Sequence, residues 1–206
     1  MKLRHIPGDA ETFEGLFSGN TSNRQSHIVK NYLFFQDSPK AYQEIVSAIR
    51  LVMPFFDDFL LIPQESGPKS EVNISWRQKG TDYPMQPYHL SDGSIRFICL
   101  ATALLQPNPP STIIIDEPEL GLHPSAIAIL AEQIKIASQR TQVIIATQSP
   151  LLIDQFAVED IIVATRKHGA SSFERLKEAD FSAWLEDYSV GELWTKNVIA
   201  GGPCHE

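Results

Sequence analysis

The sequence has few cysteines and no run rich in lysine or arginine. Its two cysteines, Cys99 and Cys204, fit neither a disulfide framework nor a metal site. The 17 Lys and Arg stand against 25 Asp and Glu, so the formal net charge is −8. These shortages exclude a cysteine-based scaffold and a strongly basic face for nucleic acid, although a local basic patch can still form.

Long hydrophobic runs are also missing. No stretch approaches the length needed to cross a bilayer. Residues 1–7 are not followed by an apolar run, so they do not form a secretory signal. At 43% hydrophobic and 20% charged residues, the chain can still bury a core. We therefore expect a folded cytoplasmic protein with no membrane partner.

A third absence is the phosphate-binding pattern Gly-x-x-x-x-Gly-Lys-Ser/Thr, known as Walker A. The nearest string is Gly67-Pro68-Lys69-Ser70, which lacks both the upstream glycine and the glycine before the lysine. We expect no apolar strand directly before it. We interpret this string as a chance match.

The second half of the chain alternates short β-branched runs with helical patterns, which is typical of an α/β fold with a mainly parallel sheet flanked by helices. The runs are apolar throughout, so we expect the strands to be buried on both faces. Expected strands cover residues 112–115, 143–146 and 160–164; expected helices cover 95–105, a segment beginning at Pro124, 181–188 and 191–197.

The first half is less regular. Residues 1–30 show no period and are expected to be loop or loosely packed chain. Residues 41–52 have helical spacing, and the alternation around Val72, Ile74 and Trp76 predicts a half-exposed strand in a small β-containing arm. We divide the chain into residues 1–88, an incomplete amino-terminal region with the arm, and residues 89–206, the α/β lobe.

Two adjacent carboxylates follow the apolar run Thr112-Ile113-Ile114-Ile115. Asp116 and Glu117 would lie at the carboxyl end of a strand, where α/β proteins bind ligands. Asp116 could hold Mg²⁺, and Glu117 could orient or deprotonate an attacking water. The simpler alternative is a strand followed by a polar turn.

Two further segments carry weaker signals. In Leu90-Ser91-Asp92-Gly93-Ser94, Ser91 is a good helix N-cap and Gly93 allows the backbone to approach an anion. Gln148 follows the second expected strand and could hydrogen-bond a phosphate or water. Taken alone, each also suits an ordinary capped helix or a strand leading into a loop.

The order of these segments resembles the ABC-type ATPase superfamily, in particular SMC/RecF-like, AAA_21-type predicted ATPases. Leu90–Ser94 is similar to the signature, Thr112–Glu117 to Walker B, Glu119–Pro124 to the D-loop, and Gln148 stands at the switch position, which is usually histidine in this superfamily. The resemblance covers roughly residues 40–203. It implies the carboxyl-terminal lobe of a P-loop ATPase whose Walker A lies elsewhere.

The resemblance implies a mechanism as well. ABC-type heads pair head to tail around ATP and Mg²⁺, so Ser91 and Gly93 would contact the γ-phosphate of a nucleotide bound by the other head. Asp116 would hold Mg²⁺, Glu117 and Gln148 would be catalytic, and the D-loop residues Gly121 and His123 would face the partner site.

The implied partner is a second copy or a Walker A-bearing chain, with DNA as a further partner in maintenance or defence. This chain alone would hydrolyse ATP weakly or not at all. The alternative is a non-catalytic dimerisation or interaction module. A nuclease of the OLD type is disfavoured, because residues 165–206 are too few for its additional domain.

Overall fold

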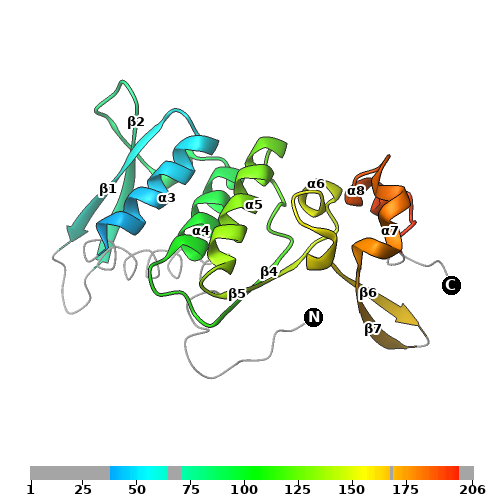
Figure 1. The fold of residues 1–206 in the computed structure, drawn as a ribbon. Helices are drawn as coiled ribbons and strands as arrows, with labels where there is room; N and C mark the ends of the chain where they lie inside the picture. Colours follow the sequence, from blue (N-terminus) through cyan, green and yellow to red (C-terminus); the bar gives the residue numbers. More distant parts are fainter. Residues whose placement is uncertain (1–37, 65–70, 168, 200–206) are drawn as a thin grey trace.

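The computed structural model describes residues 38–64, 71–167 and 169–199. The expected loop at residues 1–30 and the string at 67–70 therefore lie outside the described residues. Figure 1 shows a β-containing arm at one end, the helices α3, α4 and α5 in the middle and a small carboxyl-terminal unit at the other end. The helices are α3 (Pro39–Val52), α4 (Asp92–Leu105), α5 (Pro124–Ser138), α6 (Pro150–Ile153), α7 (Glu178–Leu185) and α8 (Val190–Thr195), with single 3₁₀ turns at Pro87–His89 and Val158–Asp160.

The three long helices begin and end where their sequences predict. Pro39 occupies the first turn of α3, which ends just before Pro54. Ser91 caps α4 by accepting a hydrogen bond from the Ser94 amide. His123 caps α5, and Pro124 follows as its first helical residue.

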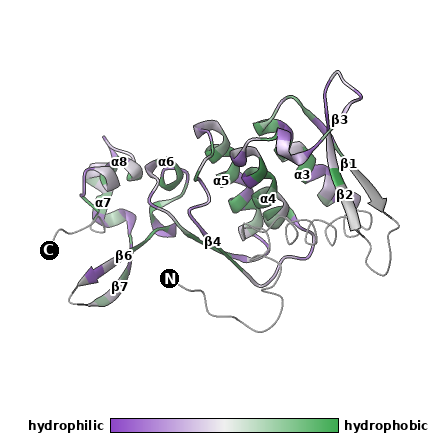
Figure 2. Cartoon of the chain, turned by 180° about the vertical axis from the view of Figure 1, so that it is seen from behind, coloured by the Kyte–Doolittle hydropathy of each residue, from purple (hydrophilic) through white to green (hydrophobic). Residues whose placement is uncertain are grey.

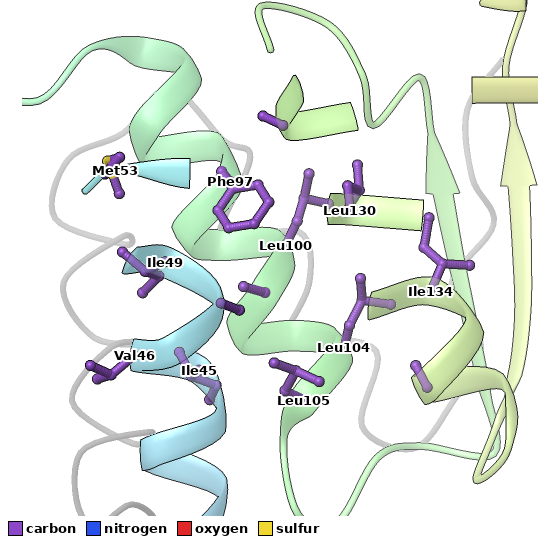
Figure 3. Close-up of a cluster of buried hydrophobic side chains, with 14 of the residues drawn as sticks. Ile45, Val46, Ile49, Met53, Phe97, Leu100, Leu104, Leu105, Leu130 and Ile134 are labelled. Atoms are coloured by element: carbon purple, nitrogen blue, oxygen red, sulfur yellow. The ribbon is translucent and has the colours of Figure 1, made fainter. Parts of the chain in front are cut away.

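These helices bury one hydrophobic core. Figure 3 shows the apolar faces of α3, α4 and α5 pointing toward one another, with α4 in the centre. Figure 2, which colours the chain by hydropathy, shows α4 as largely hydrophobic. Phe97, Leu100 and Leu104 of α4 are fully buried. Because the core joins α3 to α4, it spans the predicted boundary at residue 88, and the division into two domains stays a prediction.

The parallel sheet consists of β4 (Thr112–Asp116) and β5 (Gln142–Ala146), paired in register from Thr112↔Gln142 to Asp116↔Ala146. The α/β class with a parallel sheet is thus confirmed. The expected third strand is β6 (Ile162–Lys167), and its predicted place in this sheet was wrong. It pairs antiparallel with β7 (Ala170–Arg175), because a short turn at Gly169 lets the chain fold straight back as a hairpin.

The prediction that β4 and β5 are buried on both faces was also wrong. Burial alternates along β4: Ile113 and Ile115 are 2% and 4% exposed, whereas Ile114 between them is 50% exposed. Its cross-strand partner Ile144 is 46% exposed. The core helices cover one face, and within the described residues the other face is an apolar surface open to solvent.

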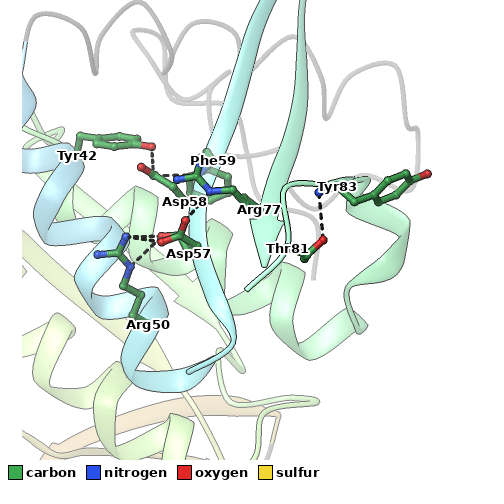
Figure 4. A network of polar contacts seen from close by, with 8 residues as sticks. All are labelled: Tyr42, Arg50, Asp57, Asp58, Phe59, Arg77, Thr81 and Tyr83. Atoms are coloured by element: carbon green, nitrogen blue, oxygen red, sulfur yellow. Dashed lines mark hydrogen bonds and ion pairs between the residues drawn. The ribbon is translucent and has the colours of Figure 1, made fainter. Parts of the chain in front are cut away.

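The arm is an antiparallel sheet of β1 (Phe56–Gln64), β2 (Glu71–Gln78) and the short β3 (Pro84–Met85). A polar network, drawn in Figure 4, fixes its base to α3. The Arg50 side chain donates from Nε to the Asp57 carbonyl oxygen at 2.8 Å, and Arg77 Nε lies 2.5 Å from Asp57 Oδ2. Tyr42 donates its hydroxyl to Asp58 at 2.5 Å.

The carboxyl-terminal unit has its own small core, which includes Val163, Leu176 and Leu193. It is anchored to the segment that follows β5, because the Gly191 amide donates to Asp154 Oδ1 at 2.6 Å. A β-carbon on Gly191 would lie 2.4 Å from the Pro150 carbonyl oxygen, so α8 packs directly on α6. Among the described residues, no helix is long and apolar enough to cross a membrane.

Candidate functional site

The parallel pairing of β4 and β5 brings the predicted catalytic residues to one edge of the sheet. Asp116 is the last residue of β4 and pairs with Ala146, the last residue of β5. The Glu117 amide extends the ladder by donating to the Ala146 carbonyl at 2.8 Å. Gln148 follows two residues after Ala146, and both Asp116 and Gln148 are exposed to solvent.

Glu117 has an unusual backbone conformation. Its φ is +44°, in the left-handed region that side chains other than glycine rarely adopt. Such conformations cost about 1–3 kcal/mol and cluster at functional sites, where the surrounding structure holds them. Two hydrogen bonds hold this conformation. The Glu117 amide donates to the Ala146 carbonyl at the end of β5, and the Leu120 amide donates to the Glu117 carbonyl at 3.3 Å. The conformation therefore supports a functional role for Glu117.

The segment resembling the D-loop turns the chain from β4 into α5. The Leu122 amide donates to the Glu119 carbonyl at 3.0 Å, and Gly121 adopts φ +76° to complete the turn. His123 Nδ1 then accepts a hydrogen bond from the Ser125 amide and lies 2.9 Å from the Ser125 hydroxyl. In this structure His123 acts as the N-cap of α5, and its predicted contact with a partner site stays a prediction.

The signature-like segment lies directly against this turn. The Ser91 hydroxyl is 2.9 Å from the Ser94 hydroxyl and caps α4 by accepting from the Ser94 amide. Ser91 is exposed to solvent at the start of this helix. Gly93 packs so closely on Gly121 that a β-carbon at position 93 would lie 2.2 Å from the Gly121 carbonyl oxygen. The structure therefore brings Ser91 and Gly93 beside the carboxylate-bearing turn of the same chain.

Two residues at this site, Arg96 and Thr147, were not assigned a role from the sequence. Arg96 of α4 donates to the carbonyl oxygens of Leu120 at 3.0 Å and Glu117 at 3.4 Å. Thr147 donates its hydroxyl to Glu119 Oε1 at 2.6 Å. Their positions in the sequence carry a usable signal: Arg96 lies one turn into the helix that follows the signature, and Thr147 precedes the switch residue.

The carboxylates suit a magnesium ion that arrives with a nucleotide. No cluster of three or more His, Cys, Asp or Glu side chains forms a metal site within the described ranges. Mg²⁺ in phosphoryl-transfer sites is typically held by one or two carboxylates together with phosphate oxygens and water. The exposed Asp116 at the end of β4 meets that requirement, whereas a resident all-protein metal site would need more ligands.

Comparisons with known proteins identify the family and the fold. The AAA_21 family, described as "AAA domain, putative AbiEii toxin, Type IV TA system", matches residues 1–154. Comparison with curated proteins gave no match.

Solved structures of SMC heads have a similar fold. One comes from work on ATP-driven dimerization and DNA-stimulated activation of SMC ATPases; it has a TM-score of 0.55 and 18% identity, over 76% of this chain and 95% of that one. An Smc head bound to the C-winged helix domain of ScpA has a TM-score of 0.55 and 17% identity, over 79% of this chain and 49% of that one.

A third similar structure is the Smc head with an extended coiled coil bound to the carboxyl-terminal domain of ScpA from Pyrococcus furiosus. It has a TM-score of 0.55 and 19% identity, over 81% of this chain and 44% of that one. This chain thus spans less than half of the second and third structures. At these identities the likeness shows the fold, and the family match covers more than half of the chain: the protein belongs to the AAA_21 family and has the α/β fold of SMC ATPase heads.

Proposed function

We propose that this chain supplies the signature, Walker B, D-loop and switch of an SMC/RecF-like ATPase. The observation that carries the proposal is the meeting of three segments at one sheet edge. Asp116 ends β4 and Glu117 follows it, Gln148 follows β5, and Gly93 of the signature-like segment packs on Gly121 of the turn after β4. Polar turns without a shared function would not be expected to lie together in this order and with this close packing.

Each residue has a role in the proposed reaction. Asp116 would hold Mg²⁺, which supplies charge neutralisation on the nucleotide phosphates when bound. Glu117, held at the strand end by the Ala146 carbonyl, would orient the attacking water and accept its proton. The Gln148 side chain can donate to a phosphate oxygen or accept from that water, but unlike histidine it cannot carry a positive charge.

The nucleotide needs a second component in this proposal. No Gly-x-x-x-x-Gly-Lys-Ser/Thr element occurs in the sequence, so the amides and lysine that neutralise a triphosphate must come from another segment or chain. The open sheet face supports this division, because the half-exposed Ile114 and Ile144 offer apolar surface to a covering element. Ser91 and Gly93 would then contact the γ-phosphate held by the opposing head.

Pairing and DNA are further parts of the proposal. One similar structure concerns SMC ATPases with ATP-driven dimerization and DNA-stimulated activation. We extend the head-to-tail pairing to this chain, either with a second copy or with a Walker A-bearing partner, and assign its ATP cycle to DNA maintenance or defence. A non-catalytic interaction module is the alternative, and the open apolar face favours it equally well.

The decisive experiment measures ATP binding and phosphate release by the full chain, with and without a Walker A-bearing partner chain. We expect turnover only in the mixture, and Glu117→Gln should abolish it while leaving nucleotide binding intact. Glu132→Gln is the matched control, because Glu132 is an exposed carboxylate on α5 whose partner is Lys135 at 2.8 Å. Failure to bind ATP in either condition would instead support the interaction module.

A further inference from the structure

A chain of hydrogen bonds runs from the D-loop to both sides of the switch residue. The Thr147 hydroxyl donates to Glu119 Oε1 at 2.6 Å. The same hydroxyl oxygen accepts a hydrogen bond from the Ser149 amide at 3.0 Å. Residues 147 and 149 flank Gln148, so the relay closes a tight turn with Gln148 at its apex.

The chemistry of a hydroxyl group makes this relay directional. Thr147 has a single hydroxyl proton, and it donates this proton in a hydrogen bond to Glu119. The oxygen then faces the Ser149 amide with its lone pairs. A bond to an ionised carboxylate is shorter and stronger than one between neutral groups, which agrees with the 2.6 Å separation. Glu119 therefore fixes the rotamer of Thr147, and Thr147 fixes the backbone on either side of Gln148.

The second oxygen of Glu119 points to a functional rather than a purely structural role. Oε2 is buried and has no hydrogen-bond partner among the described residues. Buried acceptors without partners are rare and lower stability, so each one calls for an explanation. Because this carboxylate lowers the stability of the core, its presence is better explained by a role in the adjacent site.

The same segment also contacts the signature helix. Arg96 donates to the Leu120 carbonyl, one residue after Glu119, and Gly93 packs on Gly121. The segment from Glu119 to Gly121 thus touches α4 on one side and Thr147 on the other. A displacement of this turn would reach both the signature and the switch.

We propose that Glu119 is a positioning residue that sets the orientation of Gln148 through Thr147. The proposal rests on the proposed function, since it gives Gln148 its catalytic use. Glu119 itself does not touch the nucleotide. It links the D-loop, which faces the opposing head, to the switch of its own head, so that engagement of the D-loop adjusts where the Gln148 side chain points.

The first test does not depend on turnover. Amide hydrogen exchange at Ser149 and Gln148 is measured by NMR in the full chain for Glu119→Ala, Thr147→Val and Thr147→Ser. We expect Glu119→Ala and Thr147→Val to accelerate exchange by about tenfold, because Glu119→Ala removes one hydrogen bond of the relay and Thr147→Val removes both. Thr147→Ser retains the hydroxyl and should restore protection. Unchanged exchange in Glu119→Ala, with the rest of the molecule protected as in the wild type, would overturn the link.

The second test uses the mixture with the Walker A-bearing chain. Glu119→Ala should lower kcat by roughly tenfold with KM for ATP unchanged, because the substrate contacts remain while the switch is misplaced. The double variant Glu119→Ala/Gln148→Ala should be no slower than Gln148→Ala alone. Additive losses would contradict the proposal. If the wild-type mixture shows no turnover, the proposed function fails, and the exchange test still decides whether Glu119 holds the switch.

Discussion

Gly93 and Gly121 touch through their backbones, and this contact joins the start of α4 to the turn that follows β4. A β-carbon on Gly93 would meet the Gly121 carbonyl oxygen at 2.2 Å, a separation that requires one of the two segments to move. The contact explains why a glycine occupies the first turn of a helix, where alanine would otherwise be favoured by about 1 kcal/mol.

Gly93→Ala should therefore destabilise the protein by about 1–3 kcal/mol despite its better helix propensity. Gly121→Ala is the comparison: Gly121 has φ +76° but no atom within 4 Å of a β-carbon, so only backbone strain of about 1 kcal/mol is expected. Urea unfolding of both variants measures the difference. A Gly93→Ala protein more stable than the wild type would show that the two segments are not in tight contact.

Arg96 holds the carboxylate-bearing turn from the side of α4, because its Nη1 nitrogen donates to two carbonyl oxygens, those of Leu120 and Glu117. A lysine carries its ammonium group on a flexible stem and lacks the planar guanidinium that fixes the direction of these N–H groups. We expect Arg96→Lys to cost about 1–2 kcal/mol in the free energy of unfolding, and Arg96→Met somewhat more.

The local effect separates this role from general packing. Hydrogen exchange should accelerate most at the Leu120 and Leu122 amides, which stabilise the turn, and least in the middle of α5. Arg140→Lys serves as a control, because Arg140 also donates to two carbonyls, those of Gln106 and Leu104, but far from this turn in sequence. Equal acceleration at the turn in both variants would rule out a specific role for Arg96.

Much of this arrangement could be predicted from the sequence, because the residues that start and end these helices and strands lie close together in the chain. Helix α4 follows from the Ser91 cap and the prolines after it, and the strand end at Asp116 follows from the β-branched run. The pairing of β4 with β5 follows from alternation of strands and helices. These features depend on residues close to one another in the chain.

The errors and omissions arose where distant segments decide the outcome. The sequence of β4 is apolar at Ile113, Ile114 and Ile115 alike, and only the position of the helices determines which face is covered. Strand β6 is the exception, because its antiparallel partner β7 follows it directly after the turn at Gly169. Arg96 and Thr147 stand beside the motifs in the sequence, but their hydrogen bonds join segments far apart in the chain, so the sequence does not identify their partners.

The two faces of β4 should respond differently to the same substitution. Ile115 is 4% exposed and packs in the core, so Ile115→Thr should cost more than about 2 kcal/mol through lost burial and a buried hydroxyl. Ile114→Thr retains the β-branched shape at a 50% exposed position and should change stability by less than about 0.5 kcal/mol.

A substitution on the exposed face of β4 tests whether a partner chain covers that face. In the mixture with a Walker A-bearing chain, Ile114→Thr should weaken association, although it leaves the isolated chain stable. Thermal unfolding of the chain alone and titration calorimetry with the partner chain measure the two effects. If Ile114→Thr destabilises the isolated chain as much as Ile115→Thr does, the face is already covered and is not available to a partner.

Tyr42 ties α3 to the base of the arm, and its hydrogen bond should make part of the stability depend on alkaline pH. Burial raises the pKa of the Tyr42 hydroxyl above its ordinary value, and the hydrogen bond to the nearby Asp58 carboxylate raises it further. The folded state therefore keeps the proton at pH values where the unfolded chain has lost it. The stabilisation is complete below the ordinary pKa of about 10 and decreases as the pH rises above it.

Tyr42→Phe should accordingly cost about 1 kcal/mol near neutral pH, since it removes one hydrogen bond while Asp58 still accepts from the Phe59 amide at 2.9 Å. The difference between wild type and variant should shrink as the pH is raised above about 10, because only the wild type loses this contribution. Urea unfolding at a series of pH values measures it. Tyr83→Phe, at a 66% exposed ring, is the control and should leave the free energy of unfolding unchanged. A Tyr42→Phe difference that stays constant through the alkaline range would show that the hydroxyl is not held by Asp58 in solution.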